Sequence, residues 1–368
     1  MLKAFINATF FTGEGTVSGK AMITEGGIIK GFTNHHAINN NAEIINCNNC
    51  YISPGLIDLQ IAGSGGRLFS SDLSNESLDI ITHSIVKTGT TGFLIALPTN
   101  SVEVYRKASQ VITECTHPAL LGLHFEGPFI SHLRRGAHMK EFIRPPRAED
   151  INELLDMAGS AMKMMTVAPE VWSEECVKLL LSTGVVVAAG HSNATFAEAL
   201  NGFRRGIKVT THLFNAMSQL HHRDPGLPGA TFVSENAFAS IIADGIHVDY
   251  SMVSIAKKLM KERLFLVSDA VEENLTGTYC HVKQNDRFTL PDGTLSGSKL
   301  TMLDAVRNCV NHAGIETDEA LRMATLYPAR VLNLTDRGKL APGYKADMIM
   351  FDKDFRLIEV CLEGEPVI

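Results

Sequence analysis

Four residues that can bind a metal or carry protons each stand at the end of an apolar, strand-like run: Glu126, His191, His212 and Asp269. One carboxylate and two imidazoles suit Zn²⁺ or a similar first-row ion, with a fourth position left for water. Such an ion lowers the pKa of its bound water from 15.7 to about 7. A second carboxylate can then accept the proton and later give it to a leaving group. The set therefore favours hydrolytic attack on a carbonyl or amidine carbon.

Other apolar runs also end in polar side chains. Asp58 and Gln60 close the first run, and Asp244 and His247 follow a later one. Each residue has a plain structural alternative, because a single histidine after a strand is usually a hydrogen-bonded core residue, and Asp269 could cap a helix. What favours an active site is that so many strand-like runs end in such groups.

Eight apolar runs are predicted to be the strands that position these residues. They are 51–60, 90–97, 119–126, 162–168, 184–190, 207–213, 238–244 and 263–269. Helical patterns alternate with them; in 75–87, for example, Leu78, Ile81 and Ile85 share one face. Eight strand–helix units predict an α/β fold, a (β/α)8 TIM-like barrel, with a doubly wound open sheet as the alternative. In a barrel the carboxyl ends of all strands meet at one rim, where active sites are built.

The two ends of the chain show a different pattern. Residues 1–52 and 336–368 contain short strand-like runs punctuated by turns, and neither segment can bury a face alone. We therefore expect one small discontinuous β-sandwich domain made from both termini, with residues 53–335 forming the barrel.

Composition excludes several functional classes. The net charge of −7, the pI of about 6.1 and the lack of a basic arm argue against nucleic-acid binding. No apolar run approaches the ~20 residues needed to span a bilayer, and no secretion signal is recognisable. Seven scattered cysteines fit a reducing compartment, so a cytoplasmic location is expected. Cys47 and Cys50 form a lone CxxC, which is read as two incidental thiols rather than a metal clip or redox pair.

Several segments together resemble a known family. The broader resemblance lies in Pro54-Gly55-Leu56-Ile57-Asp58, His191, His212, Asp269 and the closing segment Gly338 to Asp347. The narrower one lies in His124 to Phe129, Gly190-His191-Ser192, Thr211 to Met217, Asp244 to His247 and Ser268-Asp269-Ala270. The first set resembles the amidohydrolase superfamily, and the second is similar to N-acetylglucosamine-6-phosphate deacetylases. The resemblance covers essentially the whole chain.

This resemblance implies a reaction and a cofactor. The reaction is hydrolysis of the N-acetyl group of N-acetylglucosamine 6-phosphate to glucosamine 6-phosphate and acetate, in amino-sugar catabolism or recycling. Glu126, His191 and His212 are implied as ligands of a divalent ion, with zinc first and iron, cobalt, nickel or manganese as alternatives. Many amidohydrolases carry His-x-His after the first strand, whereas this chain has Gln60-Ile61-Ala62. We therefore predict one metal ion per subunit rather than two.

Residue roles also follow from the resemblance. Asp269 is implied as the general base and acid, acting on the metal-bound water, and His247 as a hydrogen-bond partner of the substrate carbonyl. Further substrate contacts are implied for Gln60, His138, Asn215, Ala216 and Arg223. Of these, His138 and Arg223 are the expected phosphate ligands. Arg223 is expected to reach the active site of a neighbouring subunit, which implies a homodimer.

Two alternatives remain open at this point. Another amidohydrolase acting on a cyclic amide or a nucleobase would share the metal residues and differ only where the phosphate binds. No lysine ends the run 162–168, which argues against a metal pair bridged by a carboxylated lysine. A barrel that had lost catalysis and served only in assembly would have damaged ligands, yet all four residues of the first set are present.

Overall fold

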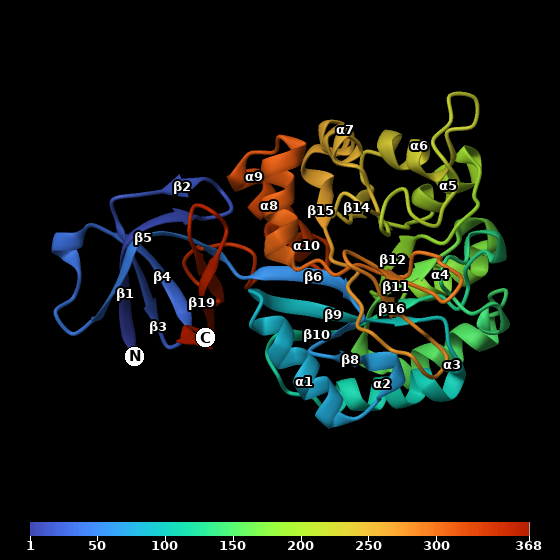
Figure 1. The fold of residues 1–368 in the computed structure, drawn as a ribbon, viewed down its shortest axis with the longest axis horizontal. Coiled ribbons are helices and arrows are strands. Elements are labelled where there is room, and N and C mark those ends of the chain that lie inside the picture. The colour runs from blue at the N-terminus through green and yellow to red at the C-terminus, as the bar shows by residue number, and fades with distance from the viewer. Residues whose placement is uncertain (368) are drawn as a thin grey trace.

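The computed structural model describes residues 1–367 and shows a large barrel beside a smaller sheet (Figure 1). The barrel contains eight parallel strands, hydrogen-bonded in the order β15-β14-β13-β12-β11-β10-β9-β6. Their bounds are β6 (Leu56–Ile61), β9 (Thr90–Pro98), β10 (Leu120–Glu126), β11 (Met162–Val167), β12 (Val186–Ala189), β13 (Val209–Thr210), β14 (Phe238–Ile241) and β15 (Leu264–Leu266). All eight predicted runs therefore contain a barrel strand.

The barrel closes between β6 and the residues that follow β15. The Asp269 backbone N–H donates to the Gln60 carbonyl at 2.9 Å, and the Ala62 N–H donates to the Ala270 carbonyl at 2.8 Å. Because the first and last strands meet in this way, the closed barrel is confirmed and the open-sheet alternative is excluded.

Helices alternate with the strands and surround the sheet (Figure 1). They are α1 (Asn75–Val86), α2 (Val102–Glu114), α3 (Ala148–Ala158), α4 (Glu174–Leu181), α5 (Phe196–Arg204), α6 (Gly226–Val233), α7 (Tyr250–Met260), α8 (Met302–Ala313), α9 (Thr317–Ala324) and α10 (Leu326–Val331). The predicted helix at 75–87 is α1, capped by the Ser74 side chain, which accepts from the Ser77 N–H. Within residues 1–367, no helix has the length and apolar character required to cross a membrane.

The two chain ends form one small sheet, as expected for a discontinuous domain. Its strands are β1 (Leu2–Phe11), β2 (Thr16–Val17), β3 (Ala21–Glu25), β4 (Ile28–Thr33), β5 (Glu43–Pro54), β18 (Met348–Phe351), β19 (Leu357–Leu362) and β20 (Glu365–Pro366). The C-terminal strand β18 pairs antiparallel with β5. At the far edge, the Ile29 N–H donates to the Tyr344 carbonyl and the Ala346 N–H to the Gly27 carbonyl, both at 2.8 Å. The sheet thus wraps round its own core, which includes Phe5, Phe10 and Met348.

The first predicted strand, 51–60, is in fact parts of two strands. Strand β5 of the small sheet continues to Pro54, past the predicted domain limit at residue 52, and barrel strand β6 begins at Leu56. Gly55 lies between them, and a Cβ atom there would lie only 1.9 Å from the Thr91 side chain. The apolar run is continuous in sequence, so periodicity alone could not reveal the change of sheet.

A long connection between β15 and α8, residues 272–298, forms what we call the flap. It contains the hairpin of β16 (Val282–Lys283) and β17 (Phe288–Thr289). The Tyr279 hydroxyl donates to the Thr99 carbonyl at 2.5 Å, and Tyr279 and Phe288 pack with Leu68. The flap is therefore attached to the barrel rim near another small hairpin, β7 (Gly63–Ser64) with β8 (Arg67–Leu68).

Candidate metal centre and active site

Glu126, His191 and His212 meet at the carboxyl-end rim of the barrel. One ligand atom from each lies within 4.8 Å of the other two, and all three residues are buried. The Glu126 Oε1 atom lies 3.7 Å from the His191 Nε2 atom and 3.5 Å from the His212 Nε2 atom. The two Nε2 atoms are 3.1 Å apart. Three donor atoms thus face one small volume.

The backbone turns sharply where each of these strands ends. His191 and His212 have positive φ angles of 47° and 33°, and Asp269 has 51°. Glu126 is followed by Gly127, whose φ is 86°. Residues other than glycine adopt this left-handed region at a cost of about 1–3 kcal/mol, and such strain concentrates at functional sites. The shared conformation turns these side chains inward over the barrel mouth.

The charge and the donor atoms of this cluster suit a bound cation. Burial by itself raises the pKa of Glu126, but hydrogen bonds and charge from His191 and His212 outweigh it and hold that pKa well below the ordinary value. Burial lowers the pKa of His212, yet Glu126 beside it raises the pKa overall. Two imidazole nitrogens 3.1 Å apart cannot both keep a proton in this space. A carboxylate with two imidazole lone pairs aimed at one point is the donor set of a zinc-type site, so the residues fit a metal ion.

Gln60 connects the metal cluster to Asp269. Its Nε2 atom donates to Glu126 Oε1 at 2.8 Å and to Asp269 Oδ1 at 2.9 Å. The side chain is 1% exposed and does not line the active-site cavity. Both donor hydrogens of the Gln60 amide are thus used by carboxylates of the site itself, and the expectation that Gln60 binds substrate stays a prediction.

Asp269 has the properties of a proton carrier. Burial raises the pKa of its carboxyl, and the nearby negative charge of Glu126 raises that pKa further. A carboxyl with a raised pKa beside a metal-type cluster can take a proton from water and release it to an amine.

A cavity of about 240 Å³ opens above these groups. Its lining includes the three metal-type ligands and Asp269, together with His138, Asn215, Ala216 and His247. Every predicted site residue except Gln60 and Arg223 therefore borders one cavity.

His138 is buried next to the metal cluster. Its ring packs edge-on against His191 with 4.2 Å between ring centroids, and its Nδ1 atom is 2.8 Å from the Thr99 hydroxyl. Burial first, and then the positive charge of His191, hold the pKa of His138 well below the ordinary value. A neutral, buried ring beside a metal ligand is poorly suited to a phosphate dianion.

His247 is oriented by a carboxylate three residues earlier. Its Nδ1 atom donates to Asp244 Oδ2 at 2.6 Å, while Asp244 Oδ1 accepts the backbone N–H groups of Ile246 and His247 at 2.9 and 2.8 Å. Burial raises the pKa of Asp244, but His247 outweighs burial and the pKa is lowered overall. This arrangement fixes the imidazole and leaves its Nε2 atom for a ligand.

Arg223 lies apart from the cavity of its own chain. It is exposed in the loop before α6, where its backbone N–H donates to His221 Nδ1 at 3.3 Å. Within residues 1–367, Arg223 makes no hydrogen bond or ion pair with the other predicted site residues.

Some residues of the cavity were not predicted. Tyr279, His281 and Ser296 reach it from the flap, with His281 Nδ1 2.9 Å from the Ser296 hydroxyl. Burial lowers the pKa of His281 to about 4, so the ring is neutral. The flap has no periodic pattern that would have indicated this. Thr99 does not line the cavity but contacts His138 through its hydroxyl; it directly follows β9, so the strand-end rule could have found it.

A model of the amidohydrolase family matches residues 51–367. The chain belongs to the amidohydrolase family. This result confirms the broader resemblance seen in the strand-end motifs and the closing Gly338 to Asp347 segment.

The relatives of this amidohydrolase described next are all named as deacetylases of N-acetylated amino-sugar 6-phosphates. It is 31% identical to N-acetylglucosamine-6-phosphate deacetylase of Haemophilus influenzae, over 99% of both chains. It is 33% identical to N-acetylgalactosamine-6-phosphate deacetylase of Shewanella sp., over 84% of this chain and 82% of that one. The crystal structure of N-acetylglucosamine-6-phosphate deacetylase from Pasteurella multocida matches with a TM-score of 0.94 and 32% identity, covering 100% and 99% of the two chains. The narrower resemblance is therefore also confirmed.

Proposed function

We propose that this amidohydrolase removes the acetyl group of N-acetylglucosamine 6-phosphate, giving glucosamine 6-phosphate and acetate. The observation that carries the proposal is the Glu126, His191 and His212 cluster with Asp269 tied to it through Gln60. The names of the relatives supply the substrate class.

One divalent ion per subunit is proposed at the Glu126, His191 and His212 cluster, with zinc first on the chemistry of the donors. When bound, such an ion lowers the pKa of a coordinated water and polarises a carbonyl oxygen. Gln60 takes the place where a second metal would need imidazole ligands, and its amide nitrogen donates to Glu126 and Asp269. This supports a single ion.

Asp269 is proposed to carry the proton. It accepts a proton from the attacking water as the new C–O bond forms at the acetyl carbon. It then gives that proton to the amine nitrogen as the C–N bond breaks, so that acetate and the free amine leave. Its raised pKa suits both steps.

Two histidines are assigned from their positions in the cavity. His138 packs against His191, so we place it at the acetyl end, where charge develops on the carbonyl oxygen. His247, held by Asp244, is placed with the sugar and its phosphate. These two roles are exchanged relative to the sequence-based expectation, because His138 is buried beside a metal ligand.

Asn215 and Ala216 border the same cavity and are proposed to contact the sugar. Arg223 is proposed to bind the phosphate in the neighbouring subunit of a homodimer, since it lies outside the cavity of its own chain in an exposed loop. A guanidinium is suited to this because it binds phosphate oxygens in pairs.

The proposal is tested by acetate release from N-acetylglucosamine 6-phosphate, measured before and after chelation, with metal counted per chain. We expect turnover that chelation abolishes and zinc restores, with about one ion per chain. Turnover that survives complete metal removal would overturn the proposed chemistry. Absence of turnover by the metal-loaded protein would overturn the substrate.

A second substrate is favoured by one observation. The Shewanella relative, 33% identical, is named for the N-acetylgalactosamine 6-phosphate substrate. The two sugars differ only at one ring hydroxyl, so kcat/KM measured for both on the same preparation decides which is preferred. A nucleobase or cyclic amide should give no turnover.

A further inference from the structure

We propose that Asp58 is a positioning residue for catalysis: its carboxylate joins β6 to the end of β15 and thereby fixes both Asp269 and Gln60. The inference rests on the proposed function, because it takes Asp269 as the proton carrier. In the sequence, Asp58 is a polar residue at the end of the first apolar run and part of the Pro54 to Asp58 motif, and no role was assigned to it.

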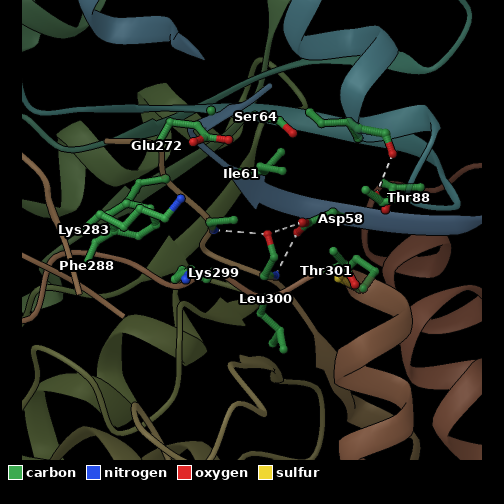
Figure 2. Close-up of a pocket in the computed structure, with 17 residues that line it drawn as sticks. Asp58, Ile61, Ser64, Thr88, Glu272, Lys283, Phe288, Lys299, Leu300 and Thr301 are labelled. Atoms are coloured by element: carbon green, nitrogen blue, oxygen red, sulfur yellow. Dashed lines mark hydrogen bonds between the residues drawn. The ribbon is translucent and has the colours of Figure 1, made fainter. Parts of the chain in front are cut away.

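Asp58 holds the chain on both sides of Asp269. Its Oδ2 atom accepts from the Ser268 hydroxyl at 2.5 Å, and its Oδ1 atom accepts from the Ser268 N–H at 3.2 Å. The Ser268 hydroxyl in turn accepts from the Ala270 N–H at 3.1 Å. Figure 2 shows Asp58 on its strand, with dashed lines marking these contacts. The residues immediately before and after Asp269 are therefore anchored to one carboxylate.

Asp58 also holds the residue that orients the Asp269 side chain. Its Oδ1 atom accepts from the Gln60 N–H at 3.1 Å. Gln60 then bonds Asp269 twice, with its carbonyl to the Asp269 N–H at 2.9 Å and with its Nε2 atom to Asp269 Oδ1 at 2.9 Å. One carboxylate thus fixes the backbone of Asp269 and the amide that orients the Asp269 carboxylate.

Such a clamp is needed because the anchored conformation is unfavourable on its own. Asp269 has a φ of 51°, a left-handed conformation that is unfavourable for residues other than glycine. The same residue lies where the barrel closes, so β6 supplies its backbone partner. Without the Asp58 bonds, Asp269 can relax to an ordinary conformation and its carboxylate moves away from Gln60.

Asp58 itself does not touch the substrate space. It is 1% exposed and lines a separate cavity of about 200 Å³, together with Lys283, Lys299 and Thr301, but not the active-site cavity (Figure 2). Any effect of Asp58 on turnover must therefore pass through Asp269 and Gln60.

The test compares Asp58→Ala with Asp347→Ala in the metal-loaded, full-length enzyme. Asp347 is a matched control, because it is a buried carboxylate that accepts a backbone N–H, from Glu363 at 2.7 Å, at the junction with the small sheet. For Asp58→Ala we expect kcat to fall about 100-fold, with KM within about three-fold and metal per chain unchanged. For Asp347→Ala we expect a lower Tm and kcat within about three-fold of wild type. Equal kcat values for the two variants, or loss of metal from Asp58→Ala, would overturn the inference.

Ser268→Ala keeps the inference testable if Asp58→Ala does not fold. It retains the carboxylate and its two backbone bonds and removes only the hydroxyl link. For Ser268→Ala we expect kcat to fall about ten-fold with KM unchanged. For Asp58→Asn, which keeps an acceptor for the Gln60 and Ser268 N–H groups, we expect a smaller fall in kcat than for Asp58→Ala. Wild-type kcat in Ser268→Ala would overturn the inference. The wild-type protein is assayed first. If it releases no acetate, the proposed function is wrong. If wild type and all these variants release acetate at the same rate, only the role of Asp58 is wrong.

Discussion

Buried charge is handled in opposite ways at the barrel rim and at the junction with the small sheet. At the junction, Arg337 and Asp347 are nearly fully buried and lie 3.2 Å apart. Arg337 also donates to the carbonyls of Thr91 and Pro118, at 2.9 and 2.7 Å. Opposite charges are thus paired and supported by the backbone, as a buried ion pair requires.

At the rim, polar groups of similar character are held together instead. Two imidazole nitrogens lie 3.1 Å apart, and the buried atoms His212 Nδ1 and Gln60 Oε1 have no hydrogen-bond partner within residues 1–367. Strained backbone adds to this cost. The junction therefore stabilises the fold, whereas the reactive groups at the rim are held in an unfavourable arrangement by the rest of the protein.

The strongest test of this contrast is Asp269→Asn. The amide cannot accept a proton from water, so we expect kcat to fall on the order of 1000-fold, within the range attributed to general acid–base groups. Metal per chain and Tm should remain close to wild type, since the amide preserves shape. Normal acetate release by this variant would remove Asp269 from the assigned role.

A pH experiment examines the charge of Asp58. Burial raises the pKa of Asp58 to about 7, from the ordinary aspartate value of 3.8. The stability that protonation contributes is therefore fully present below pH 3.8 and is lost as pH rises through about 7. The unfolding free energy of wild type minus that of Asp58→Asn should fall by up to about 4 kcal/mol between about pH 4 and pH 8.

Urea unfolding of both metal-free proteins measures this difference. Asp269 is present in both proteins, so the difference retains only the interaction of Asp269 with Asp58, which raises the pKa of Asp58. If the difference in unfolding free energy between wild type and Asp58→Asn does not change with pH, ionisation of Asp58 does not destabilise the folded protein.

At the junction, Arg337→Met should lower stability and leave kcat unchanged, the opposite of the effects expected for Asp269→Asn at the rim. Removing one partner leaves Asp347 buried without its counter-charge, and such changes cost about 3 kcal/mol or more. We expect lower stability in urea with kcat unchanged. A matching loss of kcat would contradict the separation of the two regions.

Arg223→Ala examines a residue that lies outside the cavity of its own chain. If Arg223 binds phosphate in a neighbouring subunit, KM for the phosphorylated sugar should rise about ten-fold, worth about 1.4 kcal/mol. Turnover of unphosphorylated N-acetylglucosamine should not change. Equal effects on both sugars would remove Arg223 from the phosphate site.

The smallest expected effect is that of His281→Phe in the flap. This change keeps a ring of similar size and removes the nitrogens that lie between Ser296 and the cavity. We expect about a three-fold change in kcat/KM that comes from KM, since His281 is far from Asp269 in the hydrogen-bond network. A large fall in kcat would mean that the flap takes part in the chemistry.

Prediction from the sequence succeeded where the signal was local. A strand that ends in Glu126 or His191 is recognisable from its own run of residues, and barrel geometry then brings those ends together. It failed where the meaning of a residue depends on a distant partner. Nothing near Gln60 in sequence reveals Glu126 and Asp269 as its hydrogen-bond partners, and Asp58 meets Ser268 across 210 positions. His281 was missed because a flap without periodicity carries no such signal.

The way the small sheet is assembled fixes the order in which the chain can mature. Strand β5 needs β18 as its neighbour, and between them lies the whole barrel. During synthesis every barrel strand is therefore made before the apolar face of β5 can be covered by Met348 and Met350. A ribosome-bound chain interrupted after α10 would carry every barrel strand but only part of the small sheet, because β18, β19 and β20 would not yet be made.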